Sequence, residues 1–177
     1  FKVQNAKTYG IGVYALTIRL QNIEIENSKV GLYVAANNIG LDNVNSHNNN
    51  SNDSAGAIVQ TSGYLDHIPT LTITGSKFNN NTSTTTNNEA ISGLLTYFIG
   101  CLGENGSCTA NHAVFNINDS QFNDNTAGSS AAGLSTSAFG EGGANMPVLI
   151  SANNTTFAGN TVSASKELNG SAGILFA

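Results

Sequence analysis

A short pattern that recurs along the chain constrains the fold more than any other feature of the sequence. Its clearest copy is Val114–Leu134, where an alternating apolar strand leads to Phe122, an asparagine, a polar loop and then Gly133, which opens a second apolar segment. The same order recurs around Phe78 and around Phe157. A unit that repeats every few tens of residues is typical of a solenoid, in which each unit packs on its neighbours.

The glycine that opens each second apolar segment gives the length of the repeat. Successive intervals are 21, 25, 37, 40 and 40 residues, between Gly10, Gly31, Gly56, Gly93, Gly133 and Gly173. The shortest interval cannot hold two strands and a helix, but it fits three short strands and three turns. Period-two alternation with Asn or Gly at the breaks indicates strands throughout, and no window shows the stripe of an amphipathic helix.

Strands that recur in one direction must pair in parallel with the repeats before and after. We therefore predict an all-β fold, a right-handed single-stranded parallel β-helix of about six coils with loop insertions. It would form one domain over residues 1–177, roughly 29 Å long at ~4.8 Å per coil. Because Phe1 and Phe176 both lie in strand-like sequence, we expect the chain to be a fragment or one unit of a longer protein or assembly.

In such a stack, like residues are expected to lie on like residues. We predict an aromatic stack of Phe78, Phe122 and Phe157. We also predict an apolar stack of Ile18, Ile39, Leu71, Phe115 and Ile150. Asparagines at one turn are expected to adopt left-handed backbone angles and to bond main-chain groups as an asparagine ladder. They are Asn49, Asn81, Asn125 and Asn160.

The longer intervals predict insertions into the repeat. Their expected ranges are Asn79–Glu89, Gly100–Asn111, Ser137–Asn145 and Gly159–Gly170. Each is rich in Ser, Thr, Asn and Gly, so each is expected to form a surface loop. These loops are either passive or part of a binding face.

Charge is scarce in this chain. Charged residues make up 10% of the sequence, the net charge is −5, and Arg19 is the single arginine. The sequence therefore offers no basic stripe for nucleic acid and no polybasic patch for a membrane surface. No apolar run is long enough for a membrane span. We predict neither nucleic-acid binding nor membrane insertion.

Two cysteines and a set of glycosylation motifs bear on location. Cys101 and Cys108 bracket a Gly-rich loop and are expected to form a disulfide, which indicates an oxidising, extracellular setting. The alternative is two thiols in a reducing compartment. A zinc site is not expected, because His112 is the one histidine nearby. If the source is a eukaryote, we expect N-glycans at several Asn-x-Ser/Thr motifs. These begin at Asn49, Asn52, Asn80, Asn81, Asn105, Asn118, Asn153, Asn154 and Asn169.

Two short motifs carry a family resemblance. The first is Phe78-Asn-Asn-Asn81, Phe122-Asn-Asp-Asn125 and Phe157-Ala-Gly-Asn160; the second is Ala55-Gly-Ala-Ile58, Ser92-Gly-Leu-Leu95, Ala132-Gly-Leu-Ser135 and Ala172-Gly-Ile-Leu175. Together they resemble the repeats of chlamydial polymorphic outer membrane proteins over roughly residues 40–177. The family's double Gly is replaced by Ala-Gly or Ser-Gly, and Ile25 and Ser46 stand in place of Phe. The resemblance implies a surface-exposed passenger or stalk that mediates adhesion or assembly.

The chain offers little for catalysis. Glycoside hydrolysis needs two converging carboxylates, whereas most acids here are scattered singly. Glu24 and Glu26 share one strand face, where Arg19 and Lys29 are expected nearby, and indicate a solvated surface. His47, His67 and His112 occur in unrelated contexts without a nucleophile–base pair. Asp119 and Asp124 offer a weak cation site at most. We predict no enzyme, no metal site and no cofactor.

A threonine row raises the question of ice binding. Thr70, Thr72 and Thr74 alternate on one strand. The neighbouring repeats are expected to place Arg19 and Gln21, or Asn116 and Asn118, at the equivalent positions. One row is not a ladder, so an ordinary polar strand face is the preferred interpretation.

The predicted function is an extracellular structural or adhesive rod, as a subunit of a cell-surface filament. Its ends are expected to contact adjoining segments or other copies, because an open coil exposes unpaired backbone groups. The end residues are Phe1, Val3, Ile174 and Phe176. The loops are expected to meet glycans or cell-surface molecules. The alternative is a carbohydrate-binding or carbohydrate-cleaving β-helix, which would gather the outward acids with Tyr33, Tyr64 and Tyr97 in one groove.

Overall fold

The computed structural model describes residues 1–63, 67–84, 90–101, 112–129, 131–139, 146–163 and 174–176. Within these ranges every regular element is a β-strand, and all strand pairs are parallel. None of these residues belongs to a helix that could cross a membrane. The prediction of an all-β chain of parallel strands is confirmed.

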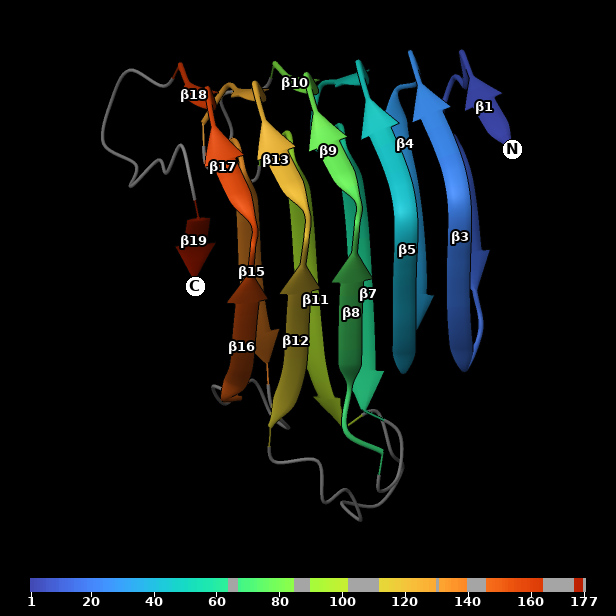
Figure 1. The fold of residues 1–177 in the computed structure, drawn as a ribbon, viewed down its shortest axis with the longest axis vertical. Helices are drawn as coiled ribbons and strands as arrows, with labels where there is room; N and C mark the ends of the chain where they lie inside the picture. Colours follow the sequence, from blue (N-terminus) through green and yellow to red (C-terminus); the bar gives the residue numbers. More distant parts are fainter. Residues whose placement is uncertain are drawn as a thin grey trace.

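The strands form three sheets (Figure 1). The nine-stranded sheet A contains β1 (Lys2–Gln4), β3 (Thr17–Glu26), β5 (Asn38–His47), β8 (Thr70–Thr74), β9 (Lys77–Asn79), β12 (Ala113–Asn118), β13 (Gln121–Asn123), β16 (Val148–Asn153) and β17 (Thr156–Ala158). The six-stranded sheet B contains β2 (Tyr9–Tyr14), β4 (Val30–Ala36), β7 (Ala57–Gly63), β11 (Leu94–Cys101), β15 (Leu134–Phe139) and β19 (Ile174–Phe176). The four-stranded sheet C contains β6 (Asn50–Ser51), β10 (Thr82–Ser83), β14 (Thr126–Ala127) and β18 (Thr161–Val162).

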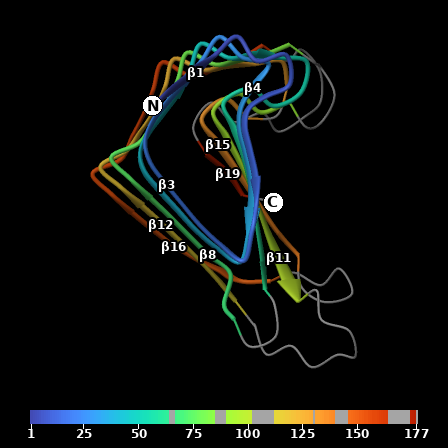
Figure 2. The ribbon, with the colours of Figure 1, turned by 90° about the vertical axis from the view of Figure 1, so that its right-hand side faces the viewer.

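The chain visits these sheets in a fixed order. From the third repeat onward it passes through sheet A, then sheet C, then sheet B, and starts again, whereas the first two repeats lack a sheet C strand. Each strand pairs with its equivalent in the neighbouring repeat. Within sheet A, and likewise within sheet B, the strands of successive repeats therefore lie behind one another in the view of Figure 2. The register places Ile18, Ile39, Leu71, Phe115 and Ile150 opposite one another in turn. The predicted apolar stack is confirmed in register, and its first four members are buried, whereas Ile150 is 38% exposed.

The interior also contains the predicted aromatic stack. The ring centroids of Phe78 and Phe122 lie 5.3 Å apart with the planes 12° from parallel, and those of Phe122 and Phe157 lie 4.9 Å apart at 8°. Phe78 and Phe122 are fully buried. The rings stack because strand pairing sets equivalent residues of parallel neighbours about 4.8 Å apart.

An asparagine ladder runs beside this stack. The backbone N–H of Asn49 donates to Asn81 Oδ1 at 3.0 Å, that of Asn81 to Asn125 Oδ1 at 3.0 Å, and that of Asn125 to Asn160 Oδ1 at 3.0 Å. The side-chain amides repeat the link, since Nδ2 of each donates to Oδ1 of the next. Ser28 takes this position one repeat earlier, and its N–H donates to Asn49 Oδ1. The predicted ladder is confirmed.

The left-handed backbone angles lie one residue away from the predicted positions. Asn48, Asn80, Asp124 and Gly159 have φ of 55°, 54°, 54° and 64°, whereas Asn49, Asn81, Asn125 and Asn160, the predicted residues, do not have positive φ. A second set of left-handed residues interrupts sheet A at Asn22, Asn43, Gly75, Asp119 and Asn154. Each left-handed residue turns the chain sharply, and the next side chain then points inward. The asparagine that turns the chain and the asparagine that forms the ladder are therefore different residues.

The predicted insertions are shorter than their sequence suggests. Asn79, Thr82–Ser83 and Thr161–Val162 lie in strands that belong to the repeat, as do Gly100–Cys101 and Ser137–Phe139. The remaining parts of the four ranges lie largely outside the described residues. Ladder turns and surface loops share the same Asn- and Thr-rich composition, so composition alone overestimated the loops.

Candidate functional site

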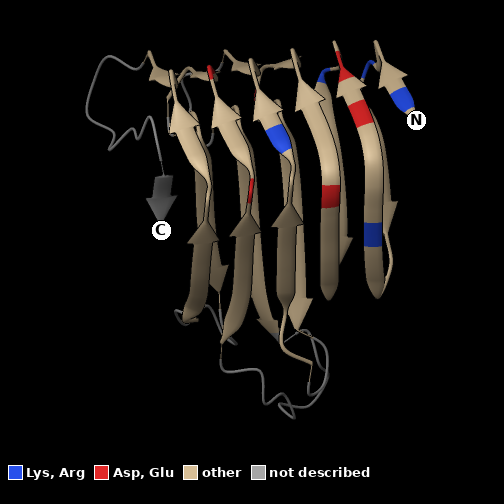
Figure 3. Ribbon diagram, viewed as in Figure 1, with Lys and Arg blue, Asp and Glu red and all other residues tan. Residues whose placement is uncertain are grey.

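Within the part of the chain that the structure describes, charged residues are sparse and several lie on the first strands of sheet A (Figure 3). Lys2 Nζ lies 2.9 Å from Glu26 Oε1 and 3.4 Å from Glu24 Oε1. His47 Nε2 lies 3.2 Å from Glu24 Oε1. The prediction that Arg19 or Lys29 pairs with these two glutamates is wrong. Arg19 Nε instead pairs with Asp42 Oδ2 at 2.7 Å. Strand register, which sets residues of successive repeats side by side, brings His47 to the glutamates.

This cluster has the donor types of a metal site but the arrangement of a surface ion network. The ligand atoms of Glu24, Glu26 and His47 lie within 4.8 Å of one another. Lys2 already supplies a cation to both carboxylates. The hydrogen bond with His47, aided by Lys2, lowers the pKa of Glu24. A general acid for glycoside cleavage needs a raised pKa instead, so Glu24 does not have the electrostatics of that acid.

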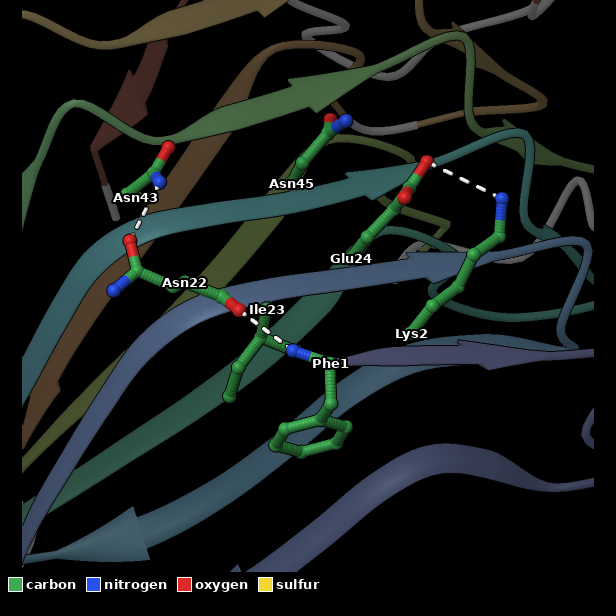
Figure 4. A pocket seen from close by; sticks show the side chains of 7 residues that line it. All are labelled: Phe1, Lys2, Asn22, Ile23, Glu24, Asn43 and Asn45. Atoms are coloured by element: carbon green, nitrogen blue, oxygen red, sulfur yellow. Dashed lines mark hydrogen bonds and ion pairs between the residues drawn. The ribbon is translucent and has the colours of Figure 1, made fainter.

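A shallow hollow of about 460 Å³ opens beside this cluster (Figure 4). It is lined by Phe1, Lys2, Asn22, Ile23, Glu24, Asn43 and Asn45. Asn43 Nδ2 donates to Asn22 Oδ1 at 2.8 Å, which ties two adjacent repeats together on its floor. Asn22 and Asn43 bond each other, whereas Figure 4 draws no bond to the Asn45 amide, which also lines the hollow.

A tyrosine cluster stands on the outer face of sheet B. The rings of Tyr9 and Tyr33 lie 5.1 Å apart at 52°, and those of Tyr14 and Tyr33 lie 5.4 Å apart at 40°. Tyr9 is 44% exposed and Tyr14 is 72% exposed. Gly12 is the strand partner of Tyr33. Because Gly12 has no side chain, the rings on either side of it are free to close over Tyr33.

The cluster continues along sheet B as an apolar strip. Ile58 and Leu95 follow Tyr33 in register, and Tyr97 lies two residues beyond Leu95 on the same face. Leu95 packs with Ile91 and Ala131, and Ile58 and Tyr97 pack against that group. We call this surface the tyrosine strip, which consists of Tyr9, Tyr14, Tyr33, Ile58, Leu95 and Tyr97. Tyr33 and Tyr97 thus share one face, Tyr64 lies outside the described residues, and the glutamates lie on sheet A.

A second hollow of about 170 Å³ lies at the edge of the tyrosine strip. Tyr9, Val30 and Ile58 form its apolar side. Thr8, Lys29, Ser51 and Asp53 supply its hydroxyl, ammonium and carboxylate groups. An aromatic cluster next to a small polar hollow is an arrangement that can orient a ligand with one apolar and one polar face.

Tyr33 gives the strip a measurable signature. Burial, together with its hydrogen bond to Tyr14, raises the pKa of Tyr33 to about 12. Because the folded pKa lies above the unfolded value, the neutral phenol stabilises the fold below pH 10 and this contribution disappears as pH rises towards 12. We expect absorbance at 295 nm to show a late tyrosine ionisation step above pH 10, and Tyr33→Phe to remove that late step. A single transition near pH 10 in the folded protein would contradict the cluster.

The structure divides the predicted glycosylation motifs. Asn49 and Asn81 are 1% and 0% exposed and belong to the buried ladder, so the folded chain has no room for a glycan at either residue. Those two predictions are wrong for this fold. Asn118 is partly buried, and Asn105 and Asn169 lie outside the described residues. The exposed acceptors are Asn52, Asn80, Asn153 and Asn154.

Expression in a eukaryotic secretory host tests this division. We expect glycopeptide mass spectrometry to find glycans within the exposed set and unmodified asparagine at Asn49 and Asn81. An exposed acceptor serves as the internal positive control. High occupancy at Asn81 in the folded, secreted protein would contradict the buried ladder.

The remaining predicted site residues are placed as follows. Asn118 and Asn153 lie side by side, with Asn153 Nδ2 donating to Asn118 Oδ1 at 3.1 Å. Asp119 Oδ1 accepts from Asn154 at 2.7 Å, whereas Asp124 takes part in a different turn, so the two acids do not converge. Cys101 ends β11, but Cys108 lies outside the described residues, and the disulfide stays a prediction.

The threonine row and the end residues complete the picture. Thr72 lies between Gly40 and Asn116, and Thr74 between Asp42 and Asn118, so the threonines of Thr70–Thr74 form one row and no ladder. Phe1 is exposed, and Val3 packs on the core opposite Ile25. Ile174 and Phe176 lie in β19, which pairs with β15. Contacts of these end residues with other segments stay a prediction.

Comparison of the chain with protein-family models, with curated proteins and with solved structures gives no match in any of the three. The resemblance to polymorphic outer membrane proteins therefore stays a prediction that depends on the short motifs alone.

Proposed function

We propose that this chain is a right-handed parallel β-helix that acts as an extracellular rod in adhesion or in building a cell-surface structure. The observation that carries this proposal is the repetition of interior contacts from repeat to repeat. Asn49, Asn81, Asn125 and Asn160 form one continuous ladder, and phenylalanines stack beside it. Such contacts stabilise a one-dimensional stack, which presents long faces to its surroundings.

The surface chemistry supports a passive or adhesive role over catalysis. The clustered glutamates share an ion pair with Lys2, and the pKa of Glu24 is lowered. The motif resemblance to chlamydial surface proteins points in the same direction. The same proposal includes the joining of rods into a filament through contacts at β1 and β19.

A second candidate function is carbohydrate binding without cleavage. The tyrosine strip is the specific observation that favours it, because exposed Tyr9 and Tyr14 lie against half-buried Tyr33 on sheet B. Binding and adhesion are compatible, since an adhesive rod needs at least one recognition surface.

Surface labelling of intact cells of the source organism tests the proposed location. An antibody to the recombinant chain is expected to label unpermeabilised cells or their extracellular matrix, with a cytosolic marker unlabelled in the same preparation. Labelling that requires permeabilisation of the cells would contradict an extracellular rod.

A further inference from the structure

We infer that the tyrosine strip is the recognition surface of the rod and that its ligand is a neutral polysaccharide, with sugar rings lying on the tyrosines. This inference rests on the proposed extracellular function and names its partner. Tyr14 and Tyr9 are exposed to solvent, at 72% and 44%. Contiguous exposed apolar patches on soluble proteins mark interaction sites, and Tyr9 and Tyr14 both contact Tyr33 in one such cluster.

Sheet B carries the tyrosines of the strip on three of its strands. Tyr9 and Tyr14 stand on β2, Tyr33 on β4 and Tyr97 on β11, so the rings are distributed along the stacking direction. Parallel pairing holds adjacent strands about 4.8 Å apart, which fixes the spacing of the backbone positions that carry the rings. A linear polymer that lies across β2 and β4 therefore meets the adjoining rings of Tyr9, Tyr14 and Tyr33, whereas half-buried Tyr97 lies beyond β7 on the same sheet. The C–H-bearing face of a pyranose ring is apolar and flat, which matches a tyrosine ring.

The charge on and beside the tyrosine strip limits the kind of ligand that it can attract. The tyrosine strip contains no charged residue, and the adjacent hollow is lined by one cation, Lys29, and one carboxylate, Asp53. A surface without net charge gives no electrostatic attraction for nucleic acid, a uronate polymer or a sulfated polymer. The chain as a whole is acidic, with a net charge of −5. Charge complementarity thus selects a neutral ligand.

Polar groups beside the tyrosine rings can form hydrogen bonds with sugar hydroxyl groups. Thr8, Lys29, Ser51 and Asp53 line the hollow next to Tyr9 and offer both donors and acceptors. Sugar hydroxyl groups both donate and accept, so they satisfy a mixed set of this kind. An apolar protein segment would leave the hollow's charged groups unsatisfied.

Binding to defined oligosaccharides tests this inference. The intact chain is titrated by calorimetry with cellohexaose, laminarihexaose, mannohexaose and chitohexaose, and with heparin and polygalacturonate as anionic probes. We expect binding to at least one neutral hexasaccharide. Tyr14→Ala is expected to weaken that binding at least about tenfold, which corresponds to about 1.4 kcal/mol. Tyr14 is largely exposed, so its removal leaves the fold intact.

Matched variants separate stacking from other effects. Tyr14→Phe keeps the ring and is expected to change affinity less than about threefold, under about 0.7 kcal/mol. Thr72→Ala on sheet A is expected to leave affinity unchanged. The inference is overturned by binding to anionic probes alone, by absence of binding to all four neutral hexasaccharides, or by an unchanged affinity of Tyr14→Ala. Those results leave the rod itself standing, because surface labelling tests it independently.

Discussion

Replacing Asn81 with alanine is expected to lower the free energy of unfolding by about 3–5 kcal/mol, since each buried polar group left unsatisfied costs about 1–3 kcal/mol. Asn81 Oδ1 accepts from the backbone N–H and the side chain of Asn49. Its Nδ2 donates to the Ser46 carbonyl at 3.0 Å and to Asn125 Oδ1 at 3.2 Å. Alanine removes all four bonds in a site with no water access. Urea unfolding followed by circular dichroism measures the loss.

Two further variants make this prediction specific. Asn81→Ser is expected to fall between the wild type and Asn81→Ala, because Ser28 already fills the equivalent position and its Oγ accepts from the Ala6 N–H at 3.1 Å. Asn116 lies on the outer face of β12, and Asn116→Ala is expected to change stability by less than about 0.5 kcal/mol. If Asn81→Ala proved as mild as Asn116→Ala, the ladder would not be a main source of stability.

Substituting Gly93 with alanine is expected to destabilise the chain by about 3 kcal/mol or more, at the upper end of overpacking effects. A Cβ at this position would overlap the Gly133 carbonyl oxygen and lie 2.7 Å from the Ala132 carbonyl oxygen. Both atoms are backbone of the next repeat, which is held in place because the Gly93 N–H donates to the Ala132 carbonyl at 2.8 Å. The neighbouring strand would have to move away, which breaks pairing between β11 and β15.

Gly40 provides the matched control for this substitution. It lies in β5 with ordinary backbone angles, and a Cβ there would meet Arg19 Cγ at 3.5 Å, which is normal contact. Gly40→Ala is expected to be neutral or to stabilise by up to about 1 kcal/mol. Thermal unfolding of the two variants gives the comparison. Equal melting temperatures would show that the close approach of repeats at Gly93 is unimportant.

The interior could be predicted from the sequence because its signals repeat. Phe78, Phe122 and Phe157 each precede an asparagine by three residues, so one register satisfies all of them. The role of Asn80 was harder to see than that of Asn81, because both are asparagine and only the backbone angle distinguishes them. Irregular loop lengths also hid where each insertion begins.

The outer surface could not be predicted in the same way. Outward residues do not repeat, so contacts such as Lys2 with Glu26 depend on a register that the sequence does not display. The tyrosine cluster depends on Gly12 standing opposite Tyr33, which allows rings from neighbouring positions to meet diagonally. A comparison of outward positions strand by strand would have found it, once the register was known.

Contacts between the rings of the aromatic stack test the central claim of repeat-on-repeat stacking most directly. With phenylalanine selectively labelled for NMR, the ring protons of Phe122 are expected to show nuclear Overhauser effects to the rings of both Phe78 and Phe157, at centroid separations of 5.3 and 4.9 Å. Phe122→Leu assigns these signals by removing them. Contacts to neither ring, or to one of them alone, would contradict the stacking of successive repeats.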